Sequence, residues 1–304
     1  MGARLGRGIR ASAHAHRGTE RVELSMTSSW GIDAREPGRT LLVGCGKIGV
    51  RLGERVLAGG GEVVAIRRNA TGLPTGFRTI AADLEKPLAQ ELPEFDSVVI
   101  TLPPSRAESE RGSIYPLALP AIADALSTTP SRVVFVSSTR VFEGRPGPDP
   151  LTEQDATATT SAGGAALVEG ERLARELLGA TVVRPAGIYG PGRDSLIRRV
   201  RAGDAIDAAR RTNRIHETDL VRLLEVLLRA AHPPTLVHGV DREPVPLGEV
   251  AAFIATGLGV PMPPALDPPV GGGTVLDGSL LRDLVGELRY PTFREGYAEM
   301  IAQR

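Results

Sequence analysis

The chain has 304 residues, of which 41% are hydrophobic, and its 36 basic side chains balance 36 acidic ones. This length suits one large α/β domain or a domain with a small lobe, and the zero net charge argues against a general nucleic-acid or membrane-surface binder. The single cysteine, Cys45, excludes both an internal disulfide and a cysteine-rich zinc site, and we expect no metal.

Residues 1–38 are predicted to lie outside the folded domain. Arg4, Arg7, Arg10 and Arg17 precede the first acidic residue, Glu20, and no apolar core of a secretory signal is present. We expect a disordered extension, with a transit peptide as the alternative. Because no apolar run approaches about 18 residues, we expect no membrane span and a cytoplasmic protein.

Short apolar runs alternate with helical patterns from residue 39 to residue 185. The expected strands are residues 40–43, 62–67, 77–81, 97–101, 132–137 and 181–184, and the expected helices are residues 48–57, 117–126 and 165–178. This alternation predicts right-handed crossovers and an α/β, Rossmann-type doubly wound parallel sheet.

Beyond Pro185 the pattern changes. Helices are expected at residues 195–202, 218–231, 247–257 and 278–304, and a last strand at 235–240. We expect a Rossmann part at about 39–185 and 212–241, and a small C-terminal substrate lobe at about 186–211 and 242–304. The helix at 218–231 is apolar around much of its circumference, as in a buried helix, and exposed parts of it could serve a homodimer.

A glycine-rich turn, Gly44-Cys-Gly-Lys-Ile-Gly49, joins the first strand to the first helix. In a dinucleotide-binding turn Gly44 permits the sharp turn, Gly46 lets the backbone approach a pyrophosphate, and Gly49 lets the helix pack on the strand. The N–H groups that begin the helix would then face the phosphates. A dinucleotide cofactor is therefore predicted, and a plain connecting loop is the alternative.

The end of the second strand carries Arg67, Arg68 and Asn69, where a reader of a ribose 2′-hydroxyl would be an acid. Two guanidinium groups suit a 2′-phosphate, so we expect NADP, with NAD as second choice. An ordinary solvated strand end is the alternative.

Together the motifs resemble the extended short-chain dehydrogenase/reductase superfamily, specifically the NAD(P)-dependent epimerase/dehydratase-like proteins. The resemblance spans residues 39–304 and rests on the glycine turn and on Ala81-Ala-Asp-Leu84, Thr101-Leu-Pro-Pro104, Val136-Ser-Ser-Thr-Arg-Val-Phe142, Arg184-Pro-Ala-Gly-Ile-Tyr-Gly-Pro-Gly-Arg193 and Arg214-Ile-His-Glu-Thr-Asp-Leu220. It implies that Asp83 contacts adenine and that Ser138 takes the place of the catalytic Ser or Thr. The residues expected at the cofactor are Gly44, Gly46, Lys47, Ile48, Gly49, Arg67, Arg68, Asp83, Leu84, Thr101, Pro103 and Pro185.

The sequence lacks the family's Tyr-x-x-x-Lys acid/base pair. Its only lysines, Lys47 and Lys86, precede its first tyrosine, Tyr115. Alignment of the helix after the fifth strand puts Ser161 at the tyrosine place and Ala165 at the lysine place. The standard proton transfer, in which lysine lowers the tyrosine pKa, is therefore absent.

Two interpretations follow from this departure. The chain could be an atypical reductase or epimerase that uses Ser138, Tyr189, His216 or Glu143, or a catalytically inactive cofactor-bound regulator or scaffold. Tyr189 is expected in the loop after the sixth strand, and His216 has a suitable ordinary pKa of about 6.5.

Seven arginines crowd a short stretch of the expected lobe: Arg193, Arg198, Arg199, Arg201, Arg210, Arg211 and Arg214. Arginine suits phosphate and carboxylate, and the resemblance makes an anionic small-molecule substrate such as a nucleotide-sugar plausible. Because Asp194, Asp204 and Asp207 lie among them, a solvated mixed-charge face is the alternative.

Overall fold

The computed structural model describes residues 30–31, 38–69, 71–88, 91–103 and 113–303. The predicted extension before Trp30, and Pro104 of the fourth-strand motif, lie outside these ranges. No helix in the described ranges is both long enough and apolar enough to cross a membrane. Nor do three or more His, Cys, Asp or Glu side chains of these residues gather as metal ligands would.

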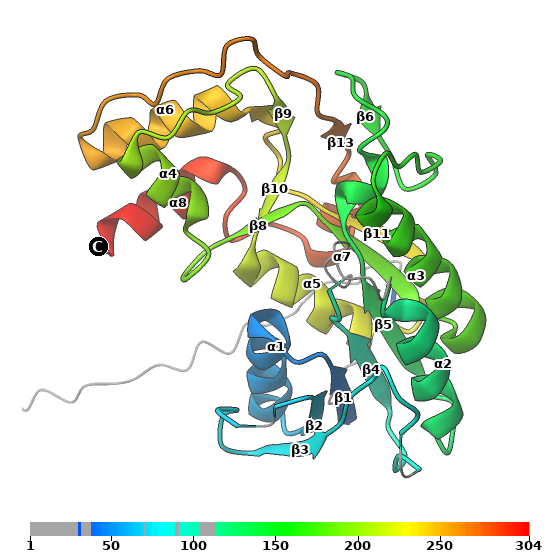
Figure 1. Cartoon of the computed structure of the whole chain (residues 1–304). Helices are drawn as coiled ribbons and strands as arrows, with labels where there is room; N and C mark the ends of the chain where they lie inside the picture. Colours follow the sequence, from blue (N-terminus) through cyan, green and yellow to red (C-terminus); the bar gives the residue numbers. More distant parts are fainter. Residues whose placement is uncertain (1–29, 32–37, 70, 89–90, 104–112, 304) are drawn as a thin grey trace, which may run out of the picture.

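The described residues form one seven-stranded parallel sheet, which confirms the predicted fold class (Figure 1). Its order is β11 (Leu236–Gly239), β7 (Thr181–Pro185), β5 (Arg132–Val136), β4 (Ser97–Ile100), β1 (Arg39–Val43), β2 (Glu62–Arg67) and β3 (Phe77–Ala81). The chain runs outward from β1 to β3 and then returns to the other side of β1 as β4. In doubly wound sheets ligands bind at the carboxyl ends of the strands beside such a reversal.

Helices cover both faces of the sheet (Figure 1). One face packs against α2 (Tyr115–Ala125) and α3 (Ala162–Leu178), and the other against α1 (Lys47–Ala58), α5 (Glu217–Arg229) and α7 (Ser279–Val285). Successive strand residues serve opposite faces, so Leu41 and Val43 join the first core and Leu42 joins the second. Buried on both sides, the central strands β4 and β5 are mainly apolar, whereas the edge strand β3 is largely exposed.

A third apolar core lies between α4 (Ser195–Ala202), α6 (Leu247–Leu258) and α8 (Phe293–Ala302). Short strands connect it with the sheet, in the pairs β8 (Gly187–Tyr189) with β10 (Arg214–His216), and β9 (Arg211–Thr212) with β12 (Val245–Pro246). A further pair joins β6 (Pro150–Leu151) and β13 (Val275–Leu276), and a 3₁₀ helix, η1 (Thr139–Phe142), follows β5. The sequence analysis did not anticipate these short elements.

Three features differ from the sequence-based expectations. Every apolar side chain of α5 is buried, because α1 and α7 pack against it, so the exposed part proposed for a homodimer is absent. The helix α7, expected within the lobe, packs on α5 and β11 instead. Before residue 39, Trp30 packs on the core of the α5 face and the carbonyl of Gly31 accepts a 2.9 Å bond from Ala231 N, so this short piece belongs to the fold.

Candidate functional site

The glycine turn lies at the carboxyl end of β1. Gly44 has a φ of +77°, and a Cβ there would lie 2.7 Å from Leu102 Cδ2, so both backbone and packing require glycine. The turn is held by Thr101, whose hydroxyl donates to the Gly44 carbonyl at 2.9 Å. A Cβ on Gly49 would approach Cys45 Sγ to 3.2 Å, which gives Gly49 the predicted packing role rather than a place in a cavity wall.

Gly46 differs from its neighbours because no protein atom demands a glycine there. A Cβ on Gly46 would meet only the Gly44 carbonyl oxygen, at an ordinary 3.8 Å. As the N-cap of α1, Gly46 offers no side-chain hydrogen bond, and the first turn of α1 has no acid. The N–H groups that begin α1 are thus open to a ligand, and the space above Gly46 suits a pyrophosphate.

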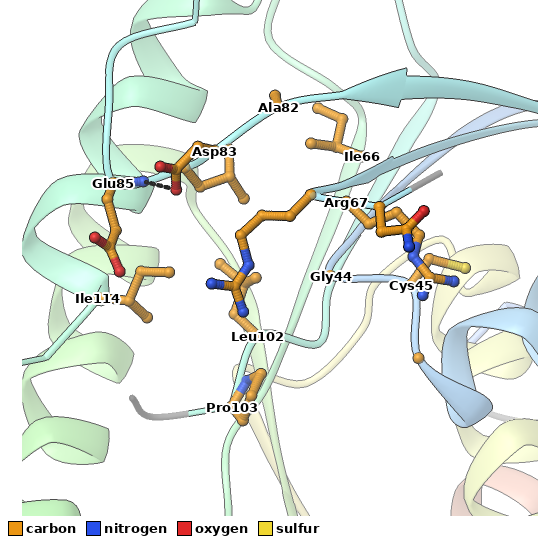
Figure 2. Close-up of a pocket in the computed structure, with 14 residues that line it drawn as sticks. Gly44, Cys45, Ile66, Arg67, Ala82, Asp83, Glu85, Leu102, Pro103 and Ile114 are labelled. Atoms are coloured by element: carbon orange, nitrogen blue, oxygen red, sulfur yellow. Dashed lines mark hydrogen bonds between the residues drawn. The ribbon is translucent and has the colours of Figure 1, made fainter. Parts of the chain in front are cut away.

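A cavity of about 810 Å³ opens beside the turn (Figure 2). In Figure 2, Gly44, Cys45 and Arg67 lie on one side of it, and Asp83, Glu85 and Ile114 on the other. It brings together seven of the predicted cofactor residues: Gly44, Gly46, Arg67, Arg68, Asp83, Leu84 and Pro103. Asp83 Oδ1 accepts a 3.3 Å bond from Glu85 N, which fixes the start of this loop.

The large cavity is lined by the thiol of the glycine turn and by two arginines at the end of β2. Neither Arg67 nor Arg68 forms an ion pair with another residue that the structure describes. Burial raises the pKa of the Cys45 thiol to about 11, an effect that Arg67 partly offsets, so the thiol stays protonated and unreactive at neutral pH.

A second cavity, of about 300 Å³, adjoins the first and shares Gly46, Leu102 and Pro103 with it. It is lined by five further predicted residues: Lys47, Ile48, Thr101, Ser138 and Pro185. Ser138 caps η1, where its hydroxyl oxygen accepts from Arg140 N at 3.2 Å. Tyr115 and Arg140 also line this cavity, and the sequence analysis did not assign them to the site. The position of Arg140, two residues after Ser138 in the fifth-strand motif, is a signal that could have found it.

The candidate catalytic residues Tyr189 and His216 lie away from both cavities. Both side chains are 3% exposed and line neither cavity. Pairing of β8 with β10 turns the Tyr189 ring onto Tyr297, at 4.7 Å between centroids, and its hydroxyl donates to Thr292 O. Burial raises the Tyr189 pKa well above its usual range.

His216 has a structural role as the N-cap of α5. Its Nδ1 accepts from Thr218 N at 3.2 Å, and its ring lies 3.7 Å from that of Tyr290. Burial lowers the His216 pKa to about 4, so the side chain is neutral at physiological pH.

The turn that would carry Tyr-x-x-x-Lys is the start of α3. Ser161 is its N-cap, accepting from Gly164 N and donating to Glu143, and Ala165 is exposed; neither lines the cavity. Burial would raise the Glu143 pKa, but hydrogen bonds from Ser161 and Thr160 outweigh it and lower the pKa. Glu143 is therefore a positioned, ionised acceptor and a weak base.

The arginines expected to bind an anionic substrate are dispersed. Arg193 lines the small cavity, whereas Arg198 pairs with Asp194 and Arg199 donates to Ala205 O on the outside of α4. Arg214 is buried over the Phe293 ring.

No protein-family model and no curated protein matches the chain, but solved structures do. A structure of a putative NAD-dependent epimerase/dehydratase from Methylobacillus flagellatus is 28% identical, with a TM-score of 0.74 over 88% of this chain and 98% of that one. MoeE5 in complex with UDP-glucose and NAD is 24% identical, with a TM-score of 0.70 over 87% and 98%.

A third similar structure is DesIV, a dTDP-glucose 4,6-dehydratase from Streptomyces venezuelae with NAD and TYD bound. It is 19% identical, with a TM-score of 0.69 over 87% of this chain and 96% of that one. The sheet order, the glycine turn and the likeness to the first of these structures confirm that the chain resembles the epimerase/dehydratase-like proteins of the extended short-chain dehydrogenase/reductase superfamily.

Proposed function

We propose that the protein binds a nicotinamide dinucleotide and acts as an oxidoreductase or epimerase on a nucleotide-sugar or another anionic small molecule. The observation that carries this proposal is the open space at Gly46, where two cavities meet over the start of α1. A pyrophosphate above Gly46 would place the adenosine half in the large cavity and the nicotinamide half in the small one. The similar structure of MoeE5, bound to UDP-glucose and NAD, supports a dinucleotide and a nucleotide-sugar as the ligands.

The roles of the chain's own residues follow from this placement. The N–H groups of Lys47 and Ile48 would bind the phosphates, and Asp83 would face adenine. When bound, the nicotinamide would supply hydride transfer. Ser138, in the same small cavity, would hydrogen-bond the substrate oxygen on the reacting carbon.

Calorimetric titration with NADP, NADPH, NAD and NADH tests the cofactor. Micromolar or tighter binding is expected, and Gly46→Val should abolish it by filling the phosphate space. Gly147→Val is the matched control, because Gly147 lines neither cavity, an added Cβ there would meet no atom within 4 Å, and its φ is not positive. No binding by folded wild-type protein would refute the proposal.

NADP is the preferred form in this proposal. Arg67 and Arg68 line the large cavity without ion pairs to described residues, and two guanidinium groups suit a 2′-phosphate. Arg67→Ala and Arg68→Ala should each weaken NADP more than NAD. Arg78→Ala, on an exposed arginine of β3 outside the cavity, should change neither. Equal affinity of the wild type for both dinucleotides would contradict the preference.

A second candidate function is that of a cofactor-bound regulator or scaffold. Among the described residues that line the small cavity, none is a His, Asp or Glu, and burial raises the pKa of its one tyrosine, Tyr115. The described part of the cavity wall therefore offers neither an imidazole nor a carboxylate for proton exchange. Incubation with dinucleotide and nucleotide-sugars, followed by NMR, separates the candidates: a product lost in Ser138→Ala identifies an enzyme, and tight dinucleotide binding without product a regulator.

A further inference from the structure

The small cavity beside Ser138 is positively charged. Three cationic side chains line it, Lys47, Arg140 and Arg193, and no acidic residue of the described chain does. The whole protein has zero net charge, so this excess is local. A cavity walled in this way favours an anionic ligand.

Two of the three cations are engaged at the junction of α1 with the loop after β8. Lys47 Nζ donates to Gly192 O at 2.7 Å. Arg193 Nε lies 3.4 Å from Glu217 Oε2, a buried carboxylate that also pairs with Arg51 at 2.8 Å. These contacts tie the loop to the cofactor helix and offset part of the charge of Arg193.

Arg140 is more exposed than Arg193, and its backbone N–H is held in place by a hydrogen bond. Ser138 Oγ accepts from its N–H, and its guanidinium is 3.6 Å from Glu143 Oε2. The other oxygen of Glu143 accepts hydrogen bonds from Ser161 and Thr160. The Glu143 carboxylate therefore has several partners besides Arg140. Just over half of the Arg140 side chain, 55%, is exposed.

The guanidinium of Arg140 lies over the start of α3, where the family resemblance places the missing tyrosine. A Cβ on Gly163 would lie 2.9 Å from Arg140 Nη1, so the absence of a side chain at Gly163 leaves room for it. A guanidinium stays charged at all physiological pH values, so Arg140 cannot replace the tyrosine as an acid. Its planar fork is instead suited to binding a carboxylate or a phosphate.

We propose that Arg140 forms an anion subsite that binds a carboxylate carried by the substrate near its reacting carbon. The inference rests on the proposed function, because the reacting carbon is placed by Ser138. Arg140 shares the small cavity with Ser138 and follows it by two residues, so the group it binds lies beside the reacting centre. The nucleotide diphosphate is the other anionic source, and the probes below separate the two.

The test uses the full-length protein saturated with its dinucleotide and titrated with UDP, UDP-glucose and UDP-glucuronic acid. The two sugars differ by one carboxylate, and a charge-assisted hydrogen bond should make the acid bind roughly 10-fold to 100-fold more tightly than UDP-glucose. Arg140→Gln should remove this difference and leave dinucleotide and UDP-glucose binding unchanged. Arg140→Lys keeps the positive charge but loses the planar guanidinium, so it should retain part of the difference in affinity between the two sugars.

Two further variants make the test specific. Gly163→Ala should weaken binding of the acid by displacing the end of the Arg140 side chain, while alanine suits the helix. Arg198→Gln is the matched control, since Arg198 is an exposed arginine of α4 outside both cavities. If Arg198→Gln lost the preference for UDP-glucuronic acid over UDP-glucose, the carboxylate would bind at the C-terminal lobe instead, and the inference would be overturned.

The remaining outcomes separate this inference from the proposed function. Equal affinity for the two sugars, or an equal loss of UDP and both sugars in Arg140→Gln, overturns the carboxylate subsite alone. Weaker dinucleotide binding in Arg140→Gln would assign the residue to the cofactor and also overturn it. Failure of all three UDP compounds to bind dinucleotide-loaded protein would overturn the nucleotide-sugar substrate and the subsite together.

Discussion

At the scale of single residues, Glu171 of α3 is a buried carboxylate in which both oxygens accept hydrogen bonds. It is 2% exposed, binds Arg184 through two bonds of 2.9 and 2.7 Å, and accepts from Ser137 Oγ at 2.6 Å. Glu171→Gln would leave the guanidinium of Arg184 buried without its counter-ion. Breaking a buried pair costs about 3–5 kcal/mol, and we expect a loss of that order in the free energy of unfolding, measured in urea.

Glu169 provides the control on the same helix. It pairs with Arg172 at 2.6 Å, but both side chains are largely in water, where ion pairs contribute little. Glu169→Gln should therefore cost far less than Glu171→Gln. Similar losses in the two variants would show that burial does not set the strength of these pairs.

Asp241 should make stability depend on pH. It is 4% exposed, and burial raises its pKa to about 7, although Arg214 partly opposes the shift. Because the unfolded pKa is about 3.9, the folded state holds the proton more tightly. The resulting stabilisation is complete below pH ~4 and is lost as the pH rises through about 7.

Asp241→Asn tests this, because asparagine stays neutral throughout. Relative to the variant, the wild type should lose stability between about pH 4 and pH 7, and change little above that, in parallel denaturant titrations. The comparison with the variant is needed because His216 and His238, whose pKa values burial lowers to about 4, change stability in the opposite direction. A constant difference between the two proteins across this range would contradict the assignment.

At the scale of elements, the contact between α2 and α3 depends on Gly170. A Cβ there would lie 2.6 Å from Tyr115 Cδ2 and 3.0 Å from Phe135 Cζ, both on fully buried rings. Rings so placed cannot move aside, and overpacking typically costs about 1–3 kcal/mol, more than alanine gains in helix propensity. Gly170→Ala should lower the free energy of unfolding.

Gly257 of α6 is the matched control for this prediction. An added Cβ would meet Ile301 Cδ1 at 3.0 Å, which is the flexible end of a partly buried side chain. Gly257→Ala should thus cost less than Gly170→Ala, or stabilise the protein. The reverse order of the two variants would contradict the importance of the α2–α3 contact.

The main helices and strands were predictable because each has a local signal. The strand Glu62–Arg67 and the helix Ser195–Ala202 occupy the predicted residues, since glycines or charged turns bound them. Two-residue strands such as β6 and β13 were not predicted. They are too short for their sequences to show the alternation of apolar and polar residues that marks a strand, and they form only because a segment far away in the sequence pairs with them. Their Val275 and Pro150 are 125 residues apart by number.

The site was predictable to the same extent. The glycine turn, Asp83 and Ser138 were located because each follows a strand end directly, and the sheet brings strand ends together. The direction of the Tyr189 side chain and the structural role of His216 could not be predicted from the sequence. Both depend on the pairing of β8 with β10 and on contacts with Tyr290 and Tyr297 near the C-terminus.

At the scale of the whole molecule, the cofactor helix α1 is linked to segments far along the chain. Lys47 reaches Gly192 O, Arg51 pairs with the buried Glu217 of α5, and Arg55 pairs with Glu225. A ligand at the start of α1 thus binds at a point where the sheet, α5 and the loop after β8 meet. Its binding energy should stabilise the molecule as one unit.

Thermal unfolding with and without dinucleotide tests this coupling. At a concentration of 100 Kd, binding to the folded state adds about 2.7 kcal/mol, which for a chain of this size raises Tm by roughly 4–5 °C. Gly46→Val should show no shift, and Gly147→Val should keep the full one. Because the links join both halves of the chain, a single transition should move as a whole; two transitions of which only one responds would show that the ion pairs of α1 do not couple the sheet to the C-terminal helices.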